Sequence, residues 1–220
     1  MKQELFPFVI LALLIPLVIV IVRVRVIDKR YYWFLIYLGM ALLGEICNIF
    51  IKNIFYRNII QNIHSIIALV ALINMLFDWG YLKNNSLVKK LLIAVFILLP
   101  TINFIFQNKN AIIIQWAFIA CTIIWILLAI QYISTILNKV NDIIVKASKI
   151  LILVPLMVTM IYFTILQILM GFLFNPKTEH FFIELYNLVL LFQIASSFCF
   201  GIALILAPKK EKFLRLNGKA

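Results

Sequence analysis

Seven long apolar runs, separated by short polar or basic stretches, limit what this chain can fold into. The runs lie at approximately 6–22, 31–51, 58–77, 87–106, 111–137, 150–174 and 181–207. A helix of roughly 20 apolar residues crosses the ~30 Å hydrocarbon core of a bilayer. Because peptide groups in lipid need hydrogen bonds within their own segment, each run is predicted to be one transmembrane helix. The sequence therefore predicts an all-α, polytopic membrane protein: a bundle of seven transmembrane helices.

The composition agrees with lipid as the main solvent of this chain. Hydrophobic residues make up 65% of the 220 residues and charged residues 13%, whereas soluble domains are about 45–50% apolar and about 25% charged. We therefore expect a single transmembrane domain over residues 1–207 and a basic tail over 208–220. Nucleic acid is not an expected partner, despite the net charge of +12, because no basic stripe is long enough to form a groove surface.

The basic residues predict how the chain is oriented. If the N-terminus is outside, 15 of the 20 lysines and arginines fall on the cytoplasmic side and five on the outer side. Cytoplasmic loops of membrane proteins carry this excess of positive charge. We therefore expect the N-terminus outside and the C-terminus in the cytoplasm, in a bacterial-type inner (cytoplasmic) membrane. Membrane lipids are the first expected partners, and the basic tail should lie along the anionic inner leaflet.

Glu45 is the one carboxylate that lies well inside an apolar run. A charge near the bilayer centre costs ~2.5–3.5 kcal/mol on insertion scales, so such groups face a bundle interior and have partners. Glu45 lies six residues before Ile51 and His64 six residues after Asn58, at the outer ends of successive runs. At 1.5 Å per residue, both lie about 9 Å below the outer surface. His64 is therefore predicted to be the partner of Glu45.

Other polar side chains of the runs also fall in the predicted outer half, while the inner half is mostly Leu, Ile, Val and Phe. Helical spacing places Asn48 on the same face as Glu45. This asymmetry predicts a polar cavity that opens outward. The predicted ligand-binding set is Glu45, Asn48, His64, Gln167, Glu184 and Asn187.

A structural interpretation of these residues stays open beside the functional one. Glu45 and His64 can equally form an ion pair that fixes helix register. Asn48, Gln167 and Asn187 can serve as hydrogen-bonding contacts between helices, each worth ~0.6 kcal/mol on average. Glu184 is close enough to the interface to be hydrated. His180 is expected in a loop.

Several chemistries lack the residues that they need. Residues 181–207 contain no lysine for a retinal Schiff base, and two histidines do not suffice for a membrane zinc hydrolase. No cofactor and no metal are expected. Two alternatives stay open: a lipid-modifying enzyme that uses Glu45 and His64 in acid–base chemistry, and a channel formed by an oligomer. Ser197 and Gly201 have the small-x-x-x-small spacing of associating helices.

Three segments carry a resemblance to a known kind of protein. They are GEICNIF at 44–50, NIIQNIHS at 58–65 and LVPLMVTMIYFTILQ at 153–167. With the seven spans, this layout resembles small seven-span bacterial membrane proteins of sensor type, which stand alone or serve as input modules of histidine kinases. The resemblance implies signal input from outside and a cytoplasmic protein partner. The leading expectation is a sensor or accessory protein that binds a small amphiphile, a lipid or a proton in the outer cavity.

Overall fold

The computed structural model describes residues 5–51, 53–80, 85–106, 112–139, 142–173 and 178–208. Within these ranges the chain forms seven α-helices and one 3-10 turn and no strand, which confirms the all-α prediction. The elements are α1 (Phe6–Arg23), η1 (Lys29–Tyr31), α2 (Tyr32–Phe50), α3 (Ile54–Asp78), α4 (Ser86–Phe106), α5 (Ile112–Lys139), α6 (Ile143–Leu173) and α7 (Glu179–Leu206).

The start of α6 differs most from the predicted helix boundaries. The apolar run was expected to begin at residue 150, after Lys149, but α6 begins at Ile143. Asp142 caps this helix, because its Oδ1 accepts hydrogen bonds from the backbone N–H groups of Ile144 (2.9 Å) and Val145 (3.2 Å). A capping aspartate satisfies the first backbone donors of a helix. Lys149 therefore belongs to a helix and not to a connecting loop.

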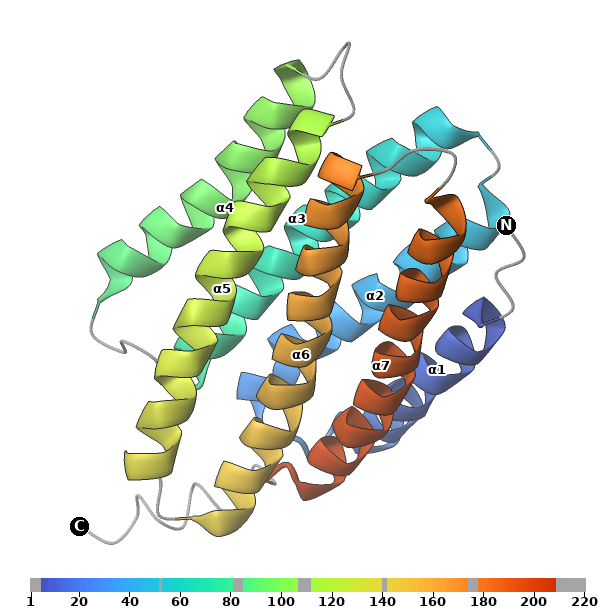
Figure 1. The fold of residues 1–220 in the computed structure, drawn as a ribbon. Coiled ribbons are helices and arrows are strands. Elements are labelled where there is room, and N and C mark those ends of the chain that lie inside the picture. The colour runs from blue at the N-terminus through green and yellow to red at the C-terminus, as the bar shows by residue number, and fades with distance from the viewer. Residues whose placement is uncertain are drawn as a thin grey trace, which may run out of the picture.

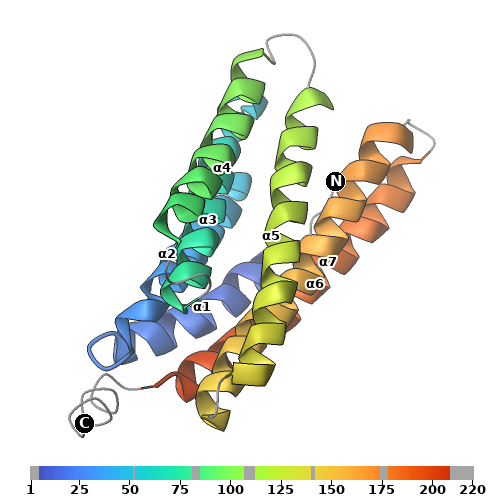
Figure 2. The ribbon, with the colours of Figure 1, turned by 90° about the vertical axis from the view of Figure 1, so that its left-hand side faces the viewer.

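The helices form a ring in chain order. Each helix packs on the helices before and after it, α1 closes the ring on α7, and α3 also contacts α5 across it. Figures 1 and 2 show α2, α3 and α4 on one side and α5, α6 and α7 on the other. Side chains from helices that are distant in sequence, such as α2 and α7, can therefore meet inside the ring.

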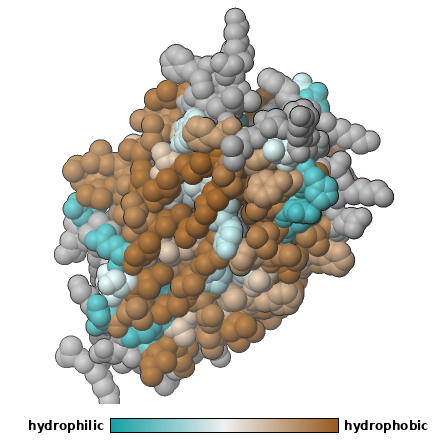
Figure 3. Space-filling model, in the orientation of Figure 1, coloured by the Kyte–Doolittle hydropathy of each residue, from teal (hydrophilic) through white to brown (hydrophobic). Residues whose placement is uncertain are grey.

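The outer surface of the ring is apolar, and polar side chains are buried inside it. On α7, Ser196 and Ser197 are buried. The exposed apolar residues of this helix recur at intervals of three, four or seven: Phe181, Leu188, Leu191, Phe198, Ile202 and Ile205. Figure 3 shows that most of this face is hydrophobic, with hydrophilic patches at the upper right and lower left. An apolar surface of this extent marks contact with lipid or with another protein.

Three helical segments are long and apolar enough to cross a membrane: Trp116–Asn138, Ile143–Met170 and His180–Leu206. Two further apolar segments, Pro7–Arg23 and Asn62–Asp78, are shorter. A bundle that presents apolar helices to its surroundings and encloses its polar groups has the arrangement that lipid requires.

Gly201 lies in the contact between α7 and α1 of the same chain. A Cβ atom at Gly201 would lie 3.3 Å from Cδ1 of Ile19 and 3.5 Å from Cγ2 of Ile15, both on α1. Small residues allow two helix backbones to approach closely. Gly201, considered above with Ser197 for association between chains, is therefore part of the α1–α7 contact that closes the ring.

Candidate functional site

Glu45 lies near the end of α2 and is half-buried. Its Oε1 accepts a hydrogen bond from Nε2 of Gln193 on α7, at 3.2 Å. Because α2 and α7 are not neighbours in the ring, this bond crosses the ring interior. Gln193, which was not among the predicted site residues, thus hydrogen-bonds Glu45. An ion pair of Glu45 with His64 is not among those described, and their pairing stays a prediction.

His64 lies on α3 beside the residue that precedes Glu45. A Cβ atom at Gly44 would be 3.1 Å from Cε1 and Nε2 of the imidazole. The ring hydrogen-bonds to the backbone carbonyl of Met40, while Nε2 is buried without a hydrogen-bond partner in the described part of the chain. The imidazole of His64 therefore packs against Gly44, the residue before Glu45.

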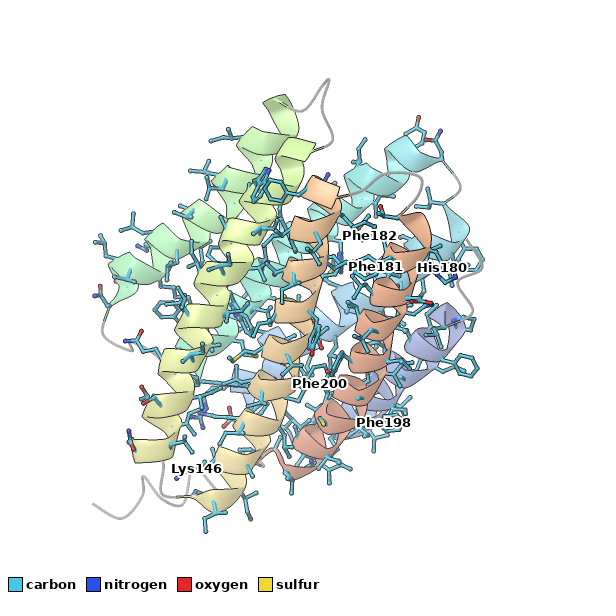
Figure 4. All side chains as sticks on the ribbon, viewed as in Figure 1. Lys146, His180, Phe181, Phe182, Phe198 and Phe200 are labelled. Carbon is cyan, nitrogen blue, oxygen red and sulfur yellow. The ribbon has the colours of Figure 1, made fainter. Side chains whose placement is uncertain are left out.

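The remaining predicted site residues lie on α2, α6 and α7. Gln167 on α6 and Asn187 on α7 are half-buried, and no described contact joins either of them to Glu45. Glu184 is exposed and pairs with Nδ1 of His180 at 3.4 Å. His180 lies on the first turn of α7, not in a loop as expected, at the opposite end of the bundle from Lys146 (Figure 4). The side chain of Asn48 lies outside the described residues.

A chain of hydrogen bonds continues from Gln193 along α7 and into α6. The Ser197 hydroxyl donates to the carbonyl of Gln193 at 2.9 Å. The hydroxyls of Ser196 and Thr159 are 3.0 Å apart, and they lie 3.3 and 3.0 Å from the carbonyl oxygen of Pro155. Since each hydroxyl has one hydrogen, one of them donates to the other and the other donates to this carbonyl. Glu45 is therefore linked through α7 to the segment of α6 that contains a proline.

A second polar cluster, here named the lysine cap, lies at the other end of the bundle. It consists of Tyr31, Trp79, Tyr132, Ser148 and Lys149, all buried. Nζ of Lys149 donates to the Trp79 carbonyl (3.2 Å) and to the Tyr132 hydroxyl (3.0 Å). That hydroxyl donates to the same carbonyl at 2.7 Å, and the hydroxyls of Tyr31 and Ser148 are 2.6 Å apart. The cap joins η1, α3, α5 and α6.

The lysine cap provides hydrogen-bond donors for the backbone carbonyl of Trp79, directly after the end of α3. Gly80 has a φ of +102°, the left-handed conformation that commonly terminates a helix, and its N–H donates to the Phe77 carbonyl at 2.9 Å. The last carbonyls of a helix have no partner in their own helix and favour a nearby cation. Lys149 supplies this cation, and its amine also lies 5.5 Å from the centroid of the Trp79 ring.

Arg23 has the same role at the end of α7. Its guanidinium donates to the carbonyls of Leu204, Ile205 and Ala207. Nearby, the backbone N–H of Asp28 donates to the carbonyl of Pro208 at 3.2 Å. Burial raises the pKa of the Asp28 carboxyl, but the hydrogen bonds and charge of Arg30 outweigh this effect, so the pKa lies below its usual value. Charged residues thus fasten the α1–α2 connection to the end of α7.

Sequence reasoning missed Gln193 and the whole lysine cap. Gln193 carried a usable signal, since it is an amide inside the apolar run 188–195, and such residues face other helices. For Lys149 the usable signal was Asp142, an N-cap residue type that could have placed the helix start before the lysine. Tyr31 begins one apolar run and Trp79 follows the end of the next. Both are residue types that anchor helices at membrane interfaces, but both are buried.

Comparison of the chain with protein-family models, with curated proteins and with solved structures finds no match. Among the described residues, no group of three or more His, Cys, Asp or Glu side chains is placed to hold a metal ion. The described side chains of the site are a carboxylate that accepts a hydrogen bond from an amide and an imidazole packed against the preceding residue, Gly44.

The contact between Gly44 and His64 predicts that two glycines of α2 respond differently to alanine. A Cβ atom at Gly39 meets nothing within 4 Å, so Gly39→Ala should stabilise the protein by roughly 0.5–1 kcal/mol through helix propensity. Gly44→Ala must displace the imidazole, which should offset this gain and cost about 1 kcal/mol more. Steric trapping in bicelles measures both free energies of unfolding. Equal effects, or a difference that persists in His64→Ala, would contradict the contact.

Proposed function

We propose that this protein is a seven-span sensor or accessory protein of the cytoplasmic membrane, with its N-terminus outside. It binds a small amphiphile, a lipid or a proton around Glu45 and signals to a cytoplasmic partner. The observation that carries this proposal is the hydrogen bond between Gln193 and Glu45 across the ring interior. An ionisable group in such a place is costly, and this cost is characteristic of functional sites in membrane proteins.

The membrane assignment is supported by the three helical segments that are long and apolar enough to cross a bilayer. It is further supported by the apolar outer face of α7 and by the excess of basic residues in alternate connecting segments. The positive-inside rule then gives the orientation. In this orientation Glu45 lies in the outer half of the bundle and the lysine cap at the cytoplasmic end.

The chemistry around Glu45 favours a ligand whose headgroup donates hydrogen bonds. Glu45 accepts a hydrogen bond at 3.2 Å from the neutral side-chain amide of Gln193. A charged donor such as an ammonium group makes a shorter and stronger bond to a carboxylate, so it can replace the Gln193 amide. The buried Nε2 of His64 offers a second polar contact, and the surrounding apolar side chains suit an alkyl chain.

A set of three ten-carbon amphiphiles tests the proposal: decylammonium, decanol and decanoate. Thermal unfolding of the protein in lipid nanodiscs is measured with increasing amounts of each. Decylammonium is expected to raise the unfolding temperature of the wild type most, and Glu45→Gln should need at least tenfold more of it for the same rise. A tenfold change corresponds to about 1.4 kcal/mol. Equal shifts with all three headgroups, or an unchanged response in Glu45→Gln, would refute the proposal.

A further inference from the structure

We propose that Glu45 and the lysine cap are coupled through a hydrogen-bonded relay that runs from α2 through α7 to α6. The relay consists of Glu45, Gln193, Ser196, Thr159 and Pro155. The start of α6, before Pro155, connects it to the lysine cap, so a movement of the proline segment moves Ser148 and Lys149. It rests on the proposed function in one respect: a ligand at Glu45 would be its input. The coupling itself needs no ligand and can be measured without one.

The first half of the relay joins three helices. Gln193 on α7 holds Glu45 on α2 at 3.2 Å. One turn along α7, Ser196 bonds to the Thr159 hydroxyl (3.0 Å) and to the Pro155 carbonyl (3.3 Å) on α6. Because Gln193 and Ser196 are three residues apart on one helix, they move together. A change in the position of Gln193 is therefore transmitted to the proline segment of α6.

Pro155 makes this segment of α6 a natural hinge. Proline has no backbone N–H, so the bond that residue 155 would donate to the carbonyl of Leu151 is missing, and such sites bend helices. Thr159 lies after the hinge, while Ser148 and Lys149 lie before it. The two parts of α6 thus make different contacts: one part bonds to α7 and the other carries the lysine cap.

The start of α6 connects the relay to the lysine cap, because two of its residues bond to other parts of the chain. Lys149 bonds to the Trp79 carbonyl after α3 and to Tyr132 on α5, and Ser148 bonds to Tyr31 of η1. A rotation of this segment about Pro155 would withdraw the amine from the end of α3. In the proposed orientation, that end faces the cytoplasm, where a partner would detect the change.

Hydrogen–deuterium exchange of the first turns of α6, residues 143–149, measures the coupling. Gln193→Leu in nanodiscs is expected to raise the exchange rate of this segment at least threefold, because leucine cannot donate a hydrogen bond to Glu45. Ser196→Ala should abolish the effect of Gln193→Leu, since alanine bonds neither to the Thr159 hydroxyl nor to the Pro155 carbonyl. Thr164→Val is the matched control, because the Thr164 hydroxyl bonds only within α6, to the Met160 carbonyl at 2.7 Å.

The outcomes separate the relay from the binding proposal. An effect of Gln193→Leu on residues 143–149 that is lost in the Ser196→Ala background and kept in the Thr164→Val background supports the relay, whichever amphiphile binds. No effect, or an effect that Ser196→Ala and Thr164→Val both leave unchanged, overturns it, even if decylammonium binds as expected. Should Gln193→Leu fold poorly, Glu45→Leu breaks the same bond from the α2 side and carries the same expectations.

Discussion

Tyr132→Phe is expected to lower the free energy of unfolding by about 2 kcal/mol, although it removes a single oxygen. Hydrogen bonds to charged groups contribute about 1.5–3 kcal/mol, and a buried group left without its partner costs more than the mean. The Tyr132 hydroxyl bonds to both the Lys149 amine and the Trp79 carbonyl. Without it, a buried ammonium loses one of its two acceptors. Steric trapping in bicelles measures the change.

Tyr162→Phe is the matched control for this prediction. Tyr162 is partly exposed and its ring stacks on Phe192, with centroids 4.5 Å apart, so loss of its hydroxyl should change stability by less than about 0.5 kcal/mol. A double-mutant cycle completes the test, because Tyr132→Phe should cost at least ~1 kcal/mol less in a Lys149→Met background. Equal costs in both backgrounds would show that the lysine and the tyrosine do not act together.

Gly201→Leu is expected to destabilise the protein by about 2–3 kcal/mol, the upper range for overpacking of a closely packed interface. Even a Cβ atom at this position lies 3.3 Å from Ile19, so a leucine must push α1 away from α7. Since this contact closes the ring, the change should also loosen α1. The free energy of unfolding is measured as above, and exchange of the α1 amides shows where the loss occurs.

Ala195→Leu provides the comparison on the same helix. Ala195 is exposed, so the added atoms enter the surroundings of the bundle and should change stability by less than about 0.5 kcal/mol. If Gly201→Leu is as mild as Ala195→Leu, α1 does not pack on α7 as described. If Gly201→Leu instead changes the oligomeric state without loss of stability, the Ser197–Gly201 pair serves association between chains.

The helices could be predicted from the sequence because a continuous apolar run leaves few alternatives to a helix. α6 begins at Ile143, before the run predicted to span the membrane from residue 150, for a physical reason. The prediction placed Lys149 in water, outside the apolar run. In the structure Lys149 is buried because the end of α3 and the Tyr132 hydroxyl provide acceptors. Such acceptors come from tertiary packing, and a single segment of sequence does not reveal them.

The depth of Glu45 and His64 was predicted from the helical rise per residue, and their pairing stays a prediction. In the structure the imidazole of His64 packs against Gly44, the residue before Glu45. Depth along a helix does not determine the rotation of the helix about its axis, which is set by packing. The hydrogen bond between Gln193 and Glu45 could therefore not be predicted from depth alone.

The expectation that the polar groups of the runs lie mostly in one half of the bundle was incomplete. Glu45 and Gln193 are joined across the ring. The other end encloses the lysine cap, whose members are each no more than 5% exposed. Its residue types, Tyr, Trp, Ser and Lys, are common at membrane interfaces. Sequence alone therefore does not distinguish an interfacial belt from a buried network.

Cross-linking across the ring tests the central claim most directly, namely that Glu45 faces the interior and α7. In a background with Cys47, Cys121 and Cys199 replaced by alanine, Glu45→Cys and Gln193→Cys are combined and treated with a short bis-methanethiosulfonate reagent. After cleavage at a protease site inserted between α6 and α7, the two fragments should remain joined. The control pairs Gln193→Cys with Leu43→Cys, whose native side chain is 53% exposed on α2, and should not be joined. Cross-linking of the control pair alone, or equal cross-linking of both pairs, would contradict the account.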